Sequence, residues 1–85
     1  MTASRIVYTR HAEEMLVERG INRGWVELTV RNPEIIEPDP VRSRVLRAFR
    51  RIPERSGRFL RVVYVQEDEI PRIVTAFFDR KRRHV

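Results

Sequence analysis

Residues 9–33 read TRHAEEMLVERGINRGWVELTVRNP, and this stretch decides the fold. Thr9 suits the position before a helix, because its hydroxyl can accept a hydrogen bond from an amide in the first turn. Gly20 suits the left-handed position that ends a helix. Apolar residues recur at helical spacing between these two signals. The stretch therefore predicts a first helix over Arg10–Arg19.

A second helix is predicted over Arg23–Arg31 by signals of the same kind. Asn22 is its candidate N-cap. Asn32-Pro33 ends it, because the residue before a proline avoids the helical region. Gly24 near its start weakens the helix by about 1 kcal/mol relative to alanine. We therefore expect the second helix to depend on packing against the rest of the domain.

The remaining segments have the pattern of strands. They are Arg5–Tyr8, Glu34–Glu37, Val41–Ile52, Phe59–Gln66 and Arg72–Phe78. Val41–Ile52 also fits a helical stripe, but Phe59–Gln66 is apolar on both faces and therefore needs a strand on each side. The sequence predicts a single α+β domain over residues 1–85: a strand, two helices, and then three or four antiparallel strands. Both helices are expected to pack on one face of this sheet.

The charge of the chain indicates a polyanionic partner. The net charge is +6, and Lys81 is the only lysine among 18 basic residues. A genome rich in G and C explains a preference for arginine over lysine, but it does not explain the positive excess. Guanidinium groups bind phosphate through two parallel hydrogen bonds, so RNA is the expected partner.

Several classes of protein are not expected. The chain has no cysteine, which excludes disulfides and thiolate metal sites and fits a reducing, cytoplasmic location. The N-terminal residues lack the apolar run of a signal peptide, and no stretch reaches the roughly 20 apolar residues that span a membrane. No glycine-rich phosphate loop, HExxH pair or nucleophile elbow is present, so neither a metal nor a cofactor is expected.

Several short motifs occur in a fixed order between about Arg5 and Phe78. They are Thr9-x-His11-Ala12, Arg19-Gly20-Ile21, Asn32-Pro33, Leu60–Tyr64 and Ile73–Phe77. Together they resemble a small bacterial domain family of unknown function that is distantly similar to the BrnT and RelE ribonuclease toxins. The resemblance implies a compact barnase/RelE-like fold and a strand rather than a helix over Val41–Ile52. It also favours toxin-like cleavage of RNA.

His11 is the candidate catalytic residue. Metal-independent cleavage of RNA needs a group that takes the 2′-hydroxyl proton and a group that protonates the leaving 5′-oxygen. Histidine exchanges protons near neutral pH. A place in the first turn of a helix favours neutral imidazole and puts free amides near a bound phosphate. The alternative is a structural histidine that hydrogen-bonds locally or packs against Tyr8 and Met15.

Six basic residues are candidates for binding RNA: Arg19, Arg47, Arg61, Lys81, Arg82 and Arg83. Arg61 is the strongest, because a charge between apolar neighbours in a central strand is costly unless it points to an open face. Arg19 lies on a helical stripe with Met15, where it fits either a phosphate contact or an ion pair with a carboxylate such as Glu27. The last three belong to a basic tail over Asp79–Val85, and most such tails are disordered.

Two classes of function follow from these residues. The first is a toxin-like, metal-independent endoribonuclease with His11 as acid or base. The second is a non-catalytic basic domain that binds RNA or an acidic protein such as an antitoxin. The lack of a second well-placed proton-transfer group favours the second class, since His84 lies at the end of the tail and Tyr64 fits a core position equally well. The family resemblance favours the first class, which we adopt as the expectation.

Overall fold

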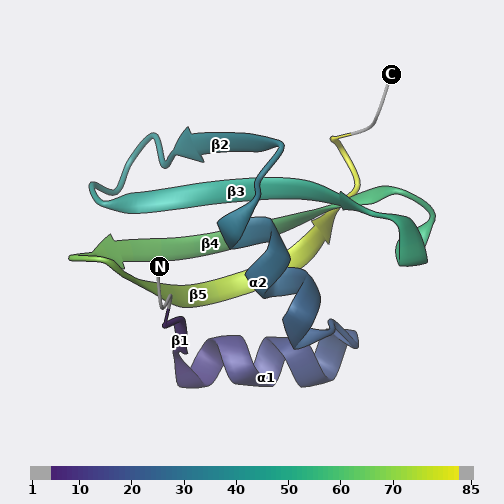
Figure 1. Cartoon of the computed structure of the whole chain (residues 1–85), viewed down its shortest axis with the longest axis horizontal. Coiled ribbons are helices and arrows are strands. Elements are labelled where there is room, and N and C mark those ends of the chain that lie inside the picture. Colours follow the sequence, from purple (N-terminus) through teal and green to yellow (C-terminus); the bar gives the residue numbers. More distant parts are fainter. Residues whose placement is uncertain (1–4, 83–85) are drawn as a thin grey trace.

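The computed structural model describes residues 5–82, in which two helices pack against a five-stranded sheet (Figure 1). The elements are β1 (Val7–Tyr8), α1 (Arg10–Arg19), α2 (Arg23–Arg31), β2 (Ile35–Pro38), β3 (Val45–Ile52), the 3₁₀ turn η1 (Pro53–Arg55), β4 (Arg58–Glu67) and β5 (Ile70–Asp79). The strand order is β1-β5-β4-β3-β2. Neighbouring strands are antiparallel except for β1, which is parallel to β5. The predicted α+β fold is confirmed.

Both helices begin and end where the sequence predicts. The hydroxyl of Thr9 accepts a hydrogen bond from the amide of Ala12 at 3.0 Å. Gly20 closes α1 with φ of 64°. The side-chain oxygen of Asn22 accepts from the amide of Gly24 at 2.7 Å and caps α2. These caps form hydrogen bonds with backbone groups only a few residues away, so they do not depend on the tertiary structure.

All five strands differ from their predicted bounds, by one residue at β2 and β4, up to two at β1 and β5, and four at β3. β3 begins at Val45 rather than Val41, because a tight turn comes first. In that turn the carboxylate of Asp39 accepts hydrogen bonds from the amides of Val41 and Arg42, at 2.8 and 2.9 Å. These bonds hold the pKa of the Asp39 carboxyl well below its usual range. β5 begins at Ile70, two residues before the predicted start, because it follows β4 through a short turn.

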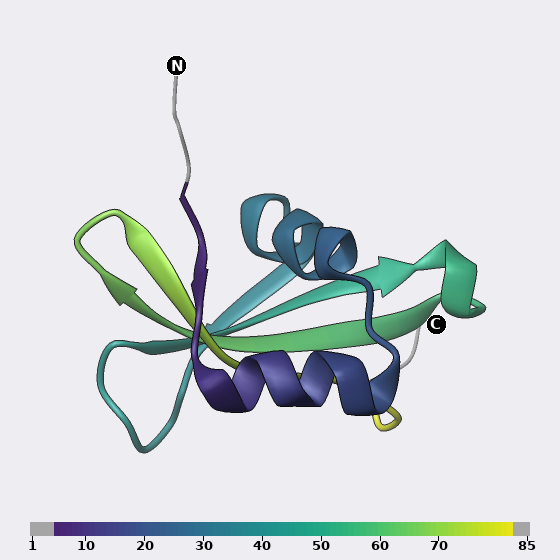
Figure 2. The ribbon, with the colours of Figure 1, turned by 90° about the horizontal axis from the view of Figure 1, so that it is seen from below.

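The hydrophobic core lies between the helices and one face of the sheet. α2 packs over β3 and β4, and α1 runs along β5 (Figure 2). The core side chains include Ala12, Leu16, Ile21, Val26, Ala48, Leu60, Val62, Tyr64, Ile73 and Ala76. Figure 2 shows α2 on one side of the sheet and α1 along its β5 edge.

Thr9 fixes the start of α1 to the sheet as well as capping it. Its amide donates to the carbonyl of Ile73 at 3.0 Å, and its hydroxyl donates to the carbonyl of Val74 at 3.4 Å. Val74 lies where the pairing of β4 and β5 shifts register. Thr9 is therefore held against β5 by backbone and side chain together.

We expect Thr9→Ala to lower the free energy of unfolding by about 1–2 kcal/mol, because the variant loses the cap and the bond to Val74. Thr9→Ser keeps a hydroxyl, so its free energy of unfolding should fall by less than half of the decrease expected for Thr9→Ala. Urea denaturation of both variants beside the wild type measures the difference. Equal midpoints for Thr9→Ala and the wild type would show that the cap contributes nothing.

Candidate nucleic-acid interface

The face of the sheet away from α2 carries charged and aromatic side chains. Successive residues of a strand point to opposite faces, so alternate residues of β3, β4 and β5 share this face. We call it the open face, and its side chains include Arg47, Phe49, Arg51, Phe59, Arg61, Val63, Thr75, Phe77 and Asp79. Arg61 of the central strand lies opposite Phe49 of β3 and Phe77 of β5. Arg61 is therefore at the middle of the open face.

Three arginines of this region share two carboxylates. Glu37 of β2 pairs with Arg47 at 3.4 Å and with Arg82 at 3.0 Å, through different oxygens. Asp79 pairs with Arg61 at 3.7 Å. Three positive charges against two negative ones leave one positive charge in excess. The two carboxylates are site residues that the sequence interpretation missed.

The guanidinium groups alternate with aromatic rings across the sheet. Arg82 lies 4.0 Å from the ring centre of Phe49, and Arg61 lies 5.7 Å from the same ring. On its other side Arg61 lies 5.1 Å from Phe77, and Arg19 of α1 lies 5.7 Å from Phe77. We call this series the cation–aromatic row. Such contacts hold a guanidinium plane in place without neutralising its charge.

Three buried donors in this region have no partner. The Nε atoms of Arg47, Arg61 and Arg82 are buried without a hydrogen bond to any described residue. A buried donor without a partner costs roughly 1–3 kcal/mol. These three guanidinium groups therefore do not gain their full hydrogen bonding within residues 5–82.

Arg19 reaches the sheet, but not the partner that the sequence suggested. Its Nη1 donates to the carbonyl of Ala76 at the edge of β5, at 2.9 Å. Glu27 instead accepts from the hydroxyl of Tyr8 at 3.1 Å and pairs with Arg31 at 3.4 Å. Of the two alternatives for Arg19, the ion pair with Glu27 is not formed within residues 5–82, because α2 directs Glu27 toward β1 and its own next turn.

The start of the predicted basic tail folds back over the sheet. After β5 the chain turns toward β2 (Figure 1). This turn is closed by the amide of Lys81, which donates to Asp79 at 2.9 Å. It brings Arg82 onto Phe49, while the side chain of Lys81 stays exposed. Arg83 and His84 lie outside the described residues.

His11 is exposed, and its imidazole makes no hydrogen bond or ion pair within residues 5–82. It lies on one stripe of α1 with Met15 and Arg19, at spacings of four residues. Arg19 contacts Phe77 of the open face, whereas Glu13 on another side of α1 pairs with Arg23 of α2. His11 is therefore on the stripe of α1 that carries Arg19, away from the side that pairs with α2.

The other proton-transfer candidates are not beside His11. Tyr64 is only 3% exposed and belongs to the core on the helix side of the sheet, where burial raises the pKa of its hydroxyl. It is therefore on the wrong face to act with Arg61. Glu37 is on β2, three strand spacings or about 14 Å from β5. His11 and Glu37 are too far apart to act on one phosphate.

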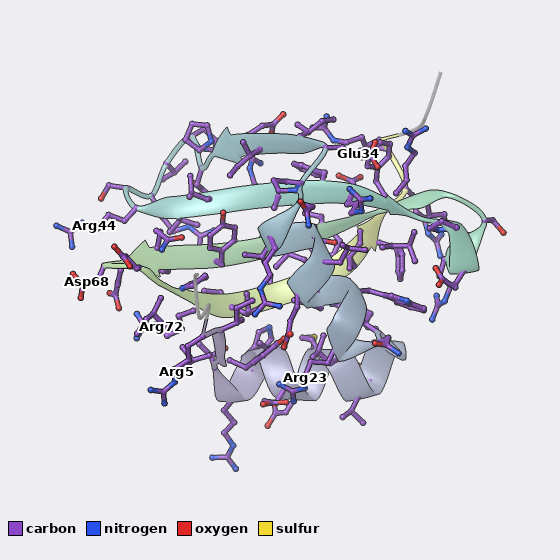
Figure 3. All side chains as sticks on the ribbon, viewed as in Figure 1. Arg5, Arg23, Glu34, Arg44, Asp68 and Arg72 are labelled. Carbon is purple, nitrogen blue, oxygen red and sulfur yellow. The ribbon has the colours of Figure 1, made fainter. Side chains whose placement is uncertain are left out.

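A separate polar cluster joins β1 to the two helices. The hydroxyl of Tyr8 donates to Glu27 at 3.1 Å, and the guanidinium of Arg23 lies 4.2 Å from the Tyr8 ring. Arg23 also pairs with Glu13 and lies against α1 (Figure 3). Burial, and then the charge and hydrogen bond of Glu27, raise the pKa of Tyr8 to about 12. The cluster connects β1, α1 and α2 and lies away from the open face.

This shift predicts a loss of stability in alkali. The folded pKa of about 12 exceeds the ordinary value of 10.0, so the stabilising effect is complete below pH 10.0 and is lost as the pH rises toward 12. Ultraviolet titration of tyrosinate should show a late phase that Tyr8→Phe removes. The free energy of unfolding should also fall less between neutral and high pH in Tyr8→Phe than in the wild type. An unchanged titration curve would contradict the assignment.

These features define a small basic α+β domain with helices on one face of its sheet and arginines on the other. The chain belongs to the family described as Domain of unknown function (DUF4258), whose model matches residues 8–78. No curated protein and no solved structure matches the chain. α1 and α2 are both too short and too polar to span a membrane. No group of three or more histidine, aspartate or glutamate side chains in residues 5–82 is arranged to hold a metal ion.

Proposed function

We propose that the protein binds RNA on the open face and cleaves it there without a metal, as a toxin-like endoribonuclease of the cytoplasm. The observation that carries the proposal is the cluster of Arg47, Arg61 and Arg82, whose guanidinium groups are fixed by rings and carboxylates. A phosphate resembles a carboxylate in charge and in hydrogen-bond geometry, so it can take the place of Glu37 or Asp79. Because these arginines are already ordered, binding loses little side-chain entropy.

The test of this binding surface compares two arginines that differ in location. Arg61 and Arg42 each pair with an aspartate, at 3.7 and 3.0 Å, but Arg42 is in the loop between β2 and β3. Arg61→Met and Arg42→Met remove the same charge while keeping most of the side-chain volume. We expect Arg61→Met to weaken RNA binding about tenfold and Arg42→Met less than twofold. Equal effects would mean that binding depends on net charge alone and not on the open face.

Cleavage is the further step of the proposal, and His11 supports it. The imidazole is exposed, and Arg19 on the same stripe of α1 contacts the open face. In the proposed reaction the 2′-hydroxyl loses its proton, its oxygen attacks the phosphorus, and the bond to the 5′-oxygen breaks. His11 would take the first proton or supply one to the 5′-oxygen, and water would make the other proton transfer. Arg19, two helical turns further along α1, would bind a neighbouring phosphate of the same strand.

A non-catalytic domain that binds RNA, or an acidic protein such as an antitoxin, is the second candidate. The separation of His11 from Glu37 favours it, because two-group proton transfer requires both groups at one phosphate. An acidic partner would bind the same arginines in place of RNA. Incubation of RNA with the purified protein in chelator distinguishes the two candidates. Cleavage products support the enzyme, and intact but bound RNA supports the binding domain.

A further inference from the structure

The cation–aromatic row runs across the sheet in a definite order, which the cluster of Arg47, Arg61 and Arg82 alone does not show. Its order is Arg82, Phe49, Arg61, Phe77 and Arg19, from the C-terminal turn over β3, β4 and β5 to α1. Members on neighbouring strands are directly opposite in register. The row therefore crosses the strands at nearly a right angle, with about 4.8 Å from one strand to the next.

The members of the row differ in what they can still bind. Phe49 is only 1% exposed, because Arg61 and Arg82 cover it. The side chains of Arg61 and Arg82 are 26% and 31% exposed, and Phe77 is half-buried. The guanidinium planes of Arg61 and Arg82 are therefore accessible, together with the exposed part of the Phe77 ring that Arg61 and Arg19 leave uncovered. Guanidinium planes and phenyl rings both stack on the faces of nucleobases.

We propose that the cation–aromatic row is a stacking site for unpaired nucleobases, with Phe77 as its principal aromatic residue. The inference rests on the proposed binding of RNA and names the form of RNA that is bound. Bases in a duplex are stacked on one another and present only their edges in the grooves. The row lies within the surface of the sheet, so it meets the faces of bases only where the RNA is single-stranded. Phosphates of the same strand would bind the outer nitrogens of Arg61 and Arg82.

The test uses 2′-O-methyl oligonucleotides, because these lack the hydroxyl that cleavage requires. A labelled single strand of about 12 uridines and a duplex of equal length are compared by fluorescence anisotropy. We expect the single strand to bind at least about fivefold more tightly, which is the lower end of one stacked base. Phe77→Leu keeps an apolar side chain and should remove this preference. Phe77→Tyr keeps the ring and should retain it, and melting temperatures identify any variant that is misfolded.

The outcomes separate the stacking site from the binding surface. A duplex that binds as tightly as the single strand overturns the stacking inference but leaves RNA binding in place. The stacking inference is also overturned if the folded Phe77→Leu variant still binds the single strand more tightly than the duplex, as the wild type does. If neither RNA binds, both the stacking site and the proposed function are rejected.

Discussion

Replacing His11 with alanine is expected to lower the rate of RNA cleavage by about 10²- to 10⁴-fold, the usual contribution of general acid–base catalysis. The melting temperature should change little, because the side chain is exposed and its imidazole makes no hydrogen bond within residues 5–82. Both quantities are measured on one preparation, with chelator present. A large loss of activity without a loss of stability would assign proton transfer to His11.

Val17→Ala is the matched control for this variant. Val17 is on the same helix and 83% exposed, but it lines the groove toward α2 rather than the side that carries His11 and Arg19. The Val17→Ala variant should cleave RNA at the rate of the wild type. A structural role for His11 predicts the reverse pattern, with an earlier melting transition and unchanged activity per folded molecule. If the wild type cleaves no RNA, with or without ribosomes, the enzyme proposal fails and the binding domain remains.

RNA affinity is expected to fall steeply with salt. Arg47, Arg61 and Arg82, with Arg19 at the edge, could neutralise roughly three or four phosphates. For a single strand the logarithm of affinity then falls by about 2–3 per logarithmic unit of salt, so affinity drops about 20- to 50-fold between about 50 and 200 mM. Fluorescence anisotropy at several salt concentrations gives this slope.

Arg61→Met should lower the magnitude of the salt slope by about 0.7, the share of one phosphate contact on a single strand. Arg42→Met should leave the slope of the wild type almost unchanged, because its guanidinium is not on the open face. Affinity that is flat across the salt range would exclude a nucleic acid as the partner.

The sequence predicts local features of this fold well. The cap residues Thr9, Gly20 and Asn22 depend on a few neighbouring amides, and the structure confirms each of them. The central position of β4 also follows from the sequence, because a strand that is apolar on both faces needs two covered sides. The sequence wrongly extends β3 to the four residues before Val45, which belong to the turn that Asp39 closes. A turn rich in arginine has the same residue pattern as a strand that carries arginines.

The candidate site is less visible in the sequence, because it depends on register and on distant contacts. Glu37 becomes a site residue only when β2 pairs with β3 so that it faces Arg47. A search for opposite charges at matching positions of the two strands could have found that pair. Arg82 reaches Glu37 from 45 residues away, and no local pattern predicts such a contact. The rotation of α2 likewise decides that Glu27 binds Tyr8 and not Arg19.

The most direct test of RNA binding on the open face is a nuclear magnetic resonance titration with single-stranded 2′-O-methyl RNA. The Nε–H groups of Arg47, Arg61 and Arg82 are buried, so they should give slowly exchanging signals before RNA is added. We predict that these signals shift together, along with amides of β3, β4 and β5. Shifts confined to the groove between α1 and α2, around Glu13 and Val17, would contradict the account, as would no shifts at all.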